Sequence, residues 1–196
     1  MAGKKRFDID TALDAAMIQF WRAGYAHTAV EDLSRATGLN RSSIYSSLGD
    51  KDTLFVRCLD RYSARYGDKY DAALSCAAEE PLAAVRAFFD VTMQRIADPA
   101  LPDGCLVAQT VMATPVLSAS VAARAREAVG FQHTRLRAAL QAGRLQDEAA
   151  GSFATHLAAV NQSLAVMSRA GTSAEELRAV VDVALDSLER ALGTGA

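Results

Sequence analysis

The chain has 196 residues, 51% of them hydrophobic, and a formal net charge of −2 at pH 7, which predicts a folded protein with a buried core. No segment approaches the roughly 18 uninterrupted apolar residues of a membrane span, and no secretion signal is recognisable at the N-terminus. We therefore expect a soluble, cytoplasmic protein without a membrane partner. Three cysteines at irregular spacing favour neither a disulfide framework nor a metal site, and no cofactor is predicted.

Apolar residues recur at intervals of three and four along the chain, while the alternation typical of strands is missing. This pattern predicts an all-α protein of about nine helices. The first helix is expected from about Asp10 to Ala23, with Ile9 at the start of its buried face and Gly24 ending it.

The next segment carries the signals of two short helices. A capping box is predicted at Thr28, whose hydroxyl would accept from the Glu31 amide while the Glu31 carboxylate reaches back. That second helix should end near residue 37, where Gly38 allows a sharp turn. Asn40 is expected to cap a third helix through about Ser47.

Asp50 should cap a long fourth helix that connects a small N-terminal head to a larger body. Five more helices are expected in the body, at about residues 81–97, 105–113, 117–142, 147–170 and 173–192. We assign residues 1–50 to a helix-turn-helix DNA-binding domain and residues 51–196 to a helical ligand-binding and dimerisation domain.

Residues 28–47 have the apolar contacts that two crossed short helices need, from Val30, Leu33, Leu39 and Ile44. The sequence DLSRATGLNRSSIY (residues 32–45) followed by GDKDTLF (residues 49–55) resembles the DNA-binding head of the tetracycline-repressor (TetR) family, as does FWRAGY (residues 20–25). The resemblance covers about residues 8–60. It departs at Leu48, where many relatives have an aromatic residue, and at Ser34, where alanine is usual.

The resemblance implies a homodimer that binds a palindromic double-stranded DNA operator and releases it when a small molecule enters the body. Most members of the family repress transcription. Arg41, Ser42, Ser43 and Ser46 would lie on the helix that enters the major groove, where an arginine can contact guanine through two N–H donors at once. Thr28, Tyr45 and Lys51 match positions that hold phosphates in the family. We list the candidate DNA-binding residues as Thr28, Asn40, Arg41, Ser42, Ser43, Tyr45, Ser46, Lys51, Lys4 and Lys5.

The distribution of charge is compatible with this reading. Residues 1–69 carry 11 Lys and Arg against 9 Asp and Glu, and all four lysines, whereas residues 70–196 carry 10 against 14. A weakly basic head on an acidic body suits a protein whose head meets phosphate. Lys4, Lys5 and Arg6 form either a solvated tail or a further contact with the DNA.

The last two helices are predicted to form the dimer interface as a four-helix arrangement. The candidate interface residues are Leu157, Asn161, Leu164, Leu177, Val181, Leu185 and Leu188. A ligand cavity is expected among the fifth to eighth helices. Its candidate lining residues are Phe89, Thr92, Met93, Cys105, Gln109, Met112, Phe131, His133 and Asn161.

Cys105 stands at the start of a helix, where free backbone amides stabilise a thiolate. An alternative reading is therefore a repressor that senses oxidants or electrophiles through this thiol, and the competing reading is a small buried residue. A further alternative is a helical interaction module without DNA binding. An enzyme is not expected, because the sequence has no paired carboxylates, nucleophile elbow or phosphate loop.

Overall fold

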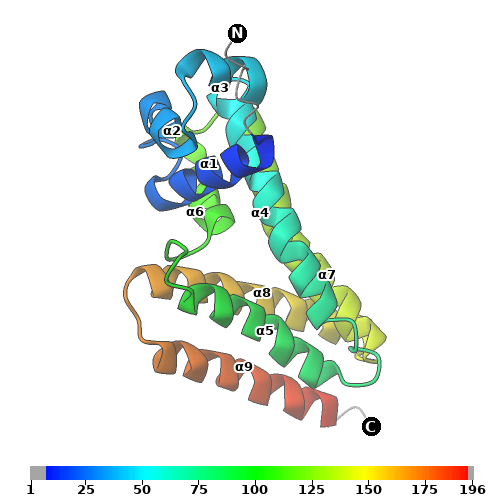
Figure 1. The fold of residues 1–196 in the computed structure, drawn as a ribbon. Helices are drawn as coiled ribbons and strands as arrows, with labels where there is room; N and C mark the ends of the chain where they lie inside the picture. The colour runs from blue at the N-terminus through cyan, green and yellow to red at the C-terminus, as the bar shows by residue number, and fades with distance from the viewer. Residues whose placement is uncertain (1–7, 194–196) are drawn as a thin grey trace.

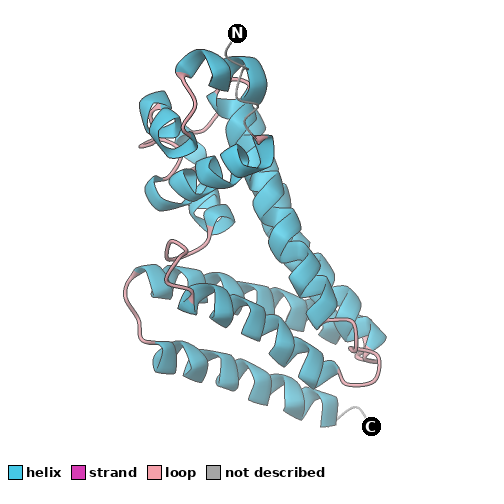
Figure 2. Ribbon diagram, in the orientation of Figure 1, coloured by secondary structure: helices cyan, strands magenta, loops and turns pink. Residues whose placement is uncertain are grey.

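The computed structural model describes residues 8–193, and within this range it contains nine α-helices, one short 3₁₀ helix and no strand (Figures 1 and 2). The all-α prediction is confirmed. No helix in the described range is long and apolar enough to cross a membrane. In chain order the elements are α1 (Ile9–Ala23), α2 (Val30–Thr37), α3 (Arg41–Leu48), α4 (Lys51–Ala73), α5 (Pro81–Ala97), α6 (Leu106–Met112), η1 (Thr114–Val116), α7 (Ala119–Ala142), α8 (Asp147–Arg169) and α9 (Ala174–Gly193).

Helix α1 is the base of the head. Asp8 caps it by accepting a hydrogen bond from the Asp10 amide (3.0 Å), and it ends at Gly24, whose φ of 81° lies in the left-handed region that favours glycine. Its buried face includes Phe20 and Trp21, both fully inaccessible to solvent. The prediction for Ile9 is wrong: this side chain is 44% exposed, because the packed face of α1 begins only at residue 12.

Helix α2 begins differently from the prediction. The first helical residue is Val30, and the cap is the Ala29 amide, which donates to the Asp32 carboxylate (2.9 Å). Thr28 is fully buried, and its hydroxyl instead donates to the Gly24 carbonyl (2.7 Å). The predicted Thr28–Glu31 capping box does not form, because Thr28 belongs to the turn that follows α1.

The turn between α2 and α3 follows the prediction. Gly38 has a φ of 70°, and Asn40 caps α3 by accepting from the Ser43 amide (2.8 Å). Leu33 and Ile44 are buried between the two helices and the rest of the head. The crossed pair is thus held by the apolar residues that the sequence indicates.

Helix α4 runs from the head down into the body (Figure 1). Asp50 caps it through the Thr53 amide (2.8 Å), as predicted. Three ion pairs attach α4 to α1. Arg61 contacts both oxygens of Asp14, at 2.7 and 2.8 Å, and also Asp10 (2.7 Å), and Arg65 contacts the Asp14 carboxylate. The Arg61 hydrogen bond holds the pKa of Asp14 below its ordinary value.

In the body, α5, α8 and α9 lie side by side below α4, and α7 packs against both α4 and α8 (Figure 1). Where α4 meets α7, Arg135 crosses over Gly67 to reach Asp71, with Nε and Nη2 donating at 2.6 and 3.2 Å. A Cβ at position 67 would lie 2.7 Å from Arg135 Nη2. Glycine at this position therefore leaves the space through which the ion pair forms.

The residues expected at a dimer interface all lie in the core of the protomer. They are Leu157, Asn161, Leu164, Leu177, Val181, Leu185 and Leu188, each 3% exposed or less. These side chains cannot also cover a partner, because α8 and α9 already bury them against each other and against the rest of the body. This assignment of interface residues is therefore corrected.

Candidate nucleic-acid interface and body pocket

The outer face of α3 carries a row of polar side chains with one arginine. Ile44 and Leu48 point into the head and are buried, which leaves the other side of this two-turn helix to solvent. The exposed side chains on that face are Arg41, Ser42, Tyr45 and Ser46. A short helix with one buried stripe and one polar stripe is a suitable shape for insertion into a major groove, which admits an α-helix.

Arg41 already has partners in this state. Its Nη1 lies 3.1 Å from Glu31 Oε1 on α2, and its guanidinium lies 5.8 Å from the ring centroid of Tyr45. Both members of the ion pair are about two-thirds exposed, so the pair is weak and easily exchanged. Arg41 is therefore aligned along the exposed face and available to an incoming acceptor.

Lys51, the first residue of α4, lies over an aromatic ring at the edge of the same head. Its Nζ is 4.3 Å from the ring centroid of Tyr25, and the Tyr25 hydroxyl donates to Asp52. Partial burial lowers the pKa of Lys51, and burial together with the Asp52 contact raises the pKa of Tyr25 to about 12. This arrangement holds a lysine ammonium at the start of α4, where a helix N-terminus also favours an anion, although the Asp50 carboxylate already caps the Thr53 amide there.

Arg57 is a residue of the head that the sequence did not single out. Its Nη1 donates to the carbonyls of Ser47 and Leu48, at 3.2 and 3.3 Å. These are the last carbonyls of α3, which have no partner within the helix. Arg57 thus ties the end of α3 to α4, and a cation near a helix C-terminus is also electrostatically favourable.

The remaining described candidates for DNA binding are buried or already hydrogen-bonded within the head. The Thr28 side chain is buried and bonded to Gly24, which does not favour a phosphate contact. The Asn40 side-chain oxygen is used as the cap of α3, and Ser43 is half-buried. Lys4 and Lys5 lie outside the described residues.

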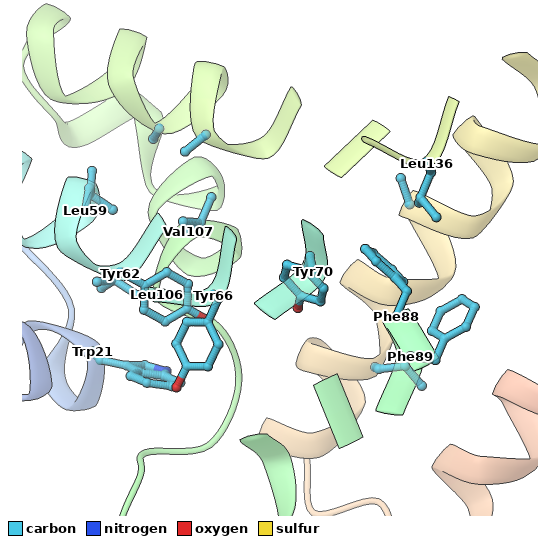
Figure 3. Packing of buried hydrophobic residues seen from close by; sticks show 14 of the residues in the cluster. Trp21, Leu59, Tyr62, Tyr66, Tyr70, Phe88, Phe89, Leu106, Val107 and Leu136 are labelled. Atoms are coloured by element: carbon cyan, nitrogen blue, oxygen red, sulfur yellow. The ribbon is translucent and has the colours of Figure 1, made fainter. Parts of the chain in front are cut away.

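A narrow pocket lies in the body beneath α4. Its walls come from α4, α5, α6, α7 and α8, and include Tyr62 and Tyr66, which pack beside Trp21 of α1 (Figure 3). The space between the walls, including the part open to solvent, amounts to about 560 Å³, of which about 40 Å³ admits a water molecule. The lining residues are Tyr62, Ser63, Tyr66, Gly67, Tyr70, Arg95, Cys105, Val107, Ala108, Ala128, Val129, Phe131, Gln132, Arg135, Asn161, Gln162 and Ala165.

The pocket includes three of the candidate ligand-binding residues, namely Cys105, Phe131 and Asn161. Thr92 lies just behind its wall: its hydroxyl donates to Asn161 Oδ1 (2.6 Å) and is 2.7 Å from the Tyr70 hydroxyl. The other candidates do not line this pocket; they are Phe89, Met93, Gln109, Met112 and His133. Of these, Phe89 is fully buried in the core, and Met112 is 65% exposed.

Gln109 has a different position, at the contact between head and body. Its Nε2 donates to the carbonyls of Phe20 and Trp21 at the end of α1, at 3.3 and 2.9 Å. Arg169 of α8 donates to Gln109 Oε1 (2.5 Å). Since Cys105 and Ala108 next to this glutamine line the pocket, the short helix α6 touches the pocket on one side and α1 on the other.

Two polar atoms in the pocket wall are buried without a hydrogen-bond partner, Ser63 Oγ and Arg95 Nε. Neither residue is identifiable as a pocket residue from the sequence, because both occur in ordinary helical patterns. In the described residues no group of three or more His, Cys, Asp and Glu side chains is arranged to hold a metal ion.

Comparison with known protein families gives two matches that together span most of the chain. Residues 12–58 match the model of bacterial regulatory proteins of the tetR family, and residues 81–184 match the tetracyclin repressor-like C-terminal domain. The first range contains α2, α3 and the exposed arginine face. The second contains most of the helices that form the pocket.

Individual proteins are similar to this chain over most of their lengths. The chain is 30% identical to the HTH-type transcriptional repressor ComR of Escherichia coli, covering 92% of this chain and 89% of that protein. It is 26% identical to the HTH-type transcriptional regulator YezE of Bacillus subtilis, covering 96% and 100%. A solved structure of a cysteine mutant of the TetR family transcriptional regulator CifR, complexed with 26-bp double-strand operator DNA, is 28% identical, with a TM-score of 0.79 over 93% and 97% of the chains.

Proposed function

Because the chain belongs to the tetR family of bacterial regulatory proteins, we propose that it is a dimeric repressor that binds a palindromic operator and is released by a small molecule. Proteins of this family are DNA-binding transcriptional regulators, so the open questions concern the operator, the effector and the assembly. The observation that carries the proposal is the exposed face of α3, with Arg41 and Tyr45 beside Lys51 at the start of α4.

In the proposed complex, α3 lies in the major groove, and other residues of the head bind the sugar-phosphate backbone of the DNA. Arg41 exchanges Glu31 for a base edge, where a bidentate contact to guanine discriminates by about 1–3 kcal/mol. Lys51 and Tyr45 contact phosphates, which supply affinity without reading sequence. Two heads related by a two-fold axis would read half-sites about one helical turn, or roughly 34 Å, apart.

The direct test is binding to the DNA upstream of the protein's own gene, measured by gel shift across a salt series. We expect a shift that is lost when the half-sites are scrambled, and the logarithm of the binding constant should fall linearly with the logarithm of salt concentration. Arg41→Ala should weaken specific binding about 5- to 150-fold for each head, whereas Arg86→Ala, an exposed change on α5, should leave it unchanged. Absence of a shift at low salt would favour an interaction module without DNA binding.

Release of the operator by an effector requires that binding in the pocket change the position of the head, and the contacts of α6 support such a coupling. The helix carries pocket residues on one side and Gln109, bonded to the end of α1, on the other. A ligand that displaces α6 would therefore act on the hydrogen bonds that orient α1. Gln109→Leu should reduce the change in operator affinity caused by an effector, which a titration of effector against preformed complex would measure.

The dimer is proposed to use the outer faces of α8 and α9. His156 and Val160 on α8 and Val180 and Val183 on α9 line a shallow apolar depression, and Val183 is 69% exposed. Covering such a patch with a second copy buries it in a four-helix arrangement. Val183→Asp should give a monomer in light scattering, while Val116→Asp, at a side chain of equal exposure on η1, should not.

A second candidate is a repressor that responds to electrophiles through Cys105. The thiol is half-buried in the pocket wall and accepts a hydrogen bond from the Tyr62 hydroxyl (3.3 Å). This position gives a reactive thiol access to the pocket and to the start of α6. Cys105→Ser should abolish release of the operator by an electrophile, and unchanged release in that variant would eliminate the thiol mechanism.

A further inference from the structure

The pocket contains a buried positive charge. Arg95 of α5 is 5% exposed, and no Asp or Glu in the described residues forms an ion pair with it. Its Nη1 donates to the Gly104 carbonyl, its guanidinium carbon lies 5.7 Å from the ring centroids of Trp21 and Tyr66, and its Nε has no partner. These contacts make up only part of the free energy that the guanidinium loses when it leaves water.

No carboxylate is among the groups that act most strongly on the guanidinium. The titratable groups that act most strongly on its charge are the phenols of Tyr62, Tyr66 and Tyr70 and the Cys105 thiol. Burial raises the pKa of Tyr62 well above that of a free phenol, and it raises the pKa of Tyr66 as well, so these rings stay uncharged. Contacts with aromatic faces attract a cation but do not cancel its charge, and a buried cation without a counter-ion is unfavourable.

The other residues of the pocket wall indicate the charge and polarity of a suitable counter-ion. Ser63 Oγ, which lines the same pocket, is a second buried polar atom without a partner and can donate a hydrogen bond. The other basic lining residue, Arg135, is already paired with Asp71 and adds no net charge. The walls are otherwise largely aromatic and aliphatic, so one negative charge on an apolar body matches the pocket better than a phosphate ester does.

We propose that this pocket binds an apolar monocarboxylate, whose carboxylate is held by Arg95 and Ser63 and whose ring or chain lies among Tyr62, Tyr66 and Phe131. The inference rests on the proposed ligand-responsive function and names the chemical class of the effector. The water-sized space is only about 40 Å³, so binding widens the pocket. Such widening occurs next to α6 and α4, which lead to the head.

The first experiment uses the full-length protein without DNA. Trp21 is the single tryptophan of the chain and lies under Arg95, so its fluorescence reports directly on the guanidinium. The probes are matched acid and amide pairs: benzoate and benzamide, phenylacetate and phenylacetamide, hexanoate and hexanamide. We expect at least one acid to change Trp21 fluorescence saturably and to raise Tm, with its amide at least tenfold weaker.

Variants then assign the site. Arg95→Met should weaken the responding acid by about 10- to 100-fold, and the exposed change Arg86→Met should not affect it. Ser63→Ala, a mild change that preserves the helix, should weaken it about 2- to 10-fold and decides the question should Arg95→Met fail to fold. The proposal is overturned when no acid binds, when amides bind as well as acids, or when acid affinity survives in Arg95→Met.

Operator binding measured on the same preparations separates the two proposals. Operator binding without any acid binding overturns the carboxylate site and leaves the regulator intact. Saturable acid binding that Arg95→Met removes supports the carboxylate site, even in a preparation that binds no operator. Absence of operator binding contradicts only the proposed function.

Discussion

Replacing Glu31 by glutamine should tighten operator binding. In the free protein the Glu31 carboxylate holds the Arg41 guanidinium at 3.1 Å, on the surface where α3 would enter the major groove. DNA must break this ion pair before Arg41 can reach a base edge, and the carboxylate also repels nearby phosphates. Glu31→Gln removes both effects while keeping the size of the side chain.

The size of the effect follows from the exposure of the pair. The two side chains are 64% and 66% exposed, and exposed ion pairs contribute about 0–1 kcal/mol. Releasing Arg41 in advance should therefore raise affinity up to about fivefold for each head, and up to about 25-fold for two heads on one operator. Salt weakens the ion pair, so the gain should shrink as ionic strength rises.

Fluorescence anisotropy with a labelled operator, at low and moderate salt, measures the change. Glu79→Gln is the matched control, because it removes one exposed carboxylate from the loop between α4 and α5, far from the head. A double-mutant cycle with Arg41→Ala isolates the coupling, since Glu31→Gln should have a smaller effect once Arg41 is absent. Weaker binding of Glu31→Gln would refute the reasoning, because it would mean that Glu31 positions Arg41 for the DNA.

Three further changes test the framework around these sites. Arg57→Met removes two hydrogen bonds at the end of α3 and should lower the free energy of unfolding by about 1–3 kcal/mol in urea melts. Asn161→Leu removes the acceptor of the Thr92 hydroxyl and should destabilise by a similar amount, about 1–3 kcal/mol, without changing operator specificity. Burial raises the pKa of the Cys58 thiol to about 12, so the protonated thiol contributes its full stability below pH 9, and this contribution should be lost as the pH rises toward 12. A thiol reagent at pH 8 should modify the exposed Cys76 and leave Cys58 unmodified until the protein unfolds.

The helices were predictable because their ends carry strong local signals. Pro81 begins α5, and Asn40 and Asp50 cap α3 and α4 as the sequence indicates. The start of α2 was missed because Thr28 and Asp32 both offer capping chemistry, and only the path of the turn after Gly24 decides between them. Local patterns thus identify a helix end but not which of two competing caps forms.

The functional surfaces were predictable to different degrees. Arg41 and Tyr45 follow from the spacing of Ile44 and Leu48, which fixes the exposed face of a short helix. The pocket was only partly predictable, because burial of Arg95 depends on helices that are distant in sequence.

The error in the dimer interface has a simple cause. A broad apolar stripe on α9 is compatible with covering either the protomer's own core or a partner, and periodicity does not distinguish the two. In the structure the strongest apolar residues, such as Leu185, face the protomer core, and weaker ones, such as Val183, remain outside.

The crossing at Gly67 has a consequence for how this chain can diverge. Glycine inside a helix costs about 1 kcal/mol relative to alanine. A Cβ here would lie 2.7 Å from Arg135 Nη2, so the end of the arginine would have to move from its present path to Asp71. Substitutions at positions 67 and 71 of α4 and position 135 of α7 should therefore depend on one another. Among descendants of this sequence, a side chain at position 67 should displace the Arg135 guanidinium, so changes at positions 135 and 71 should accompany it more often than they accompany glycine.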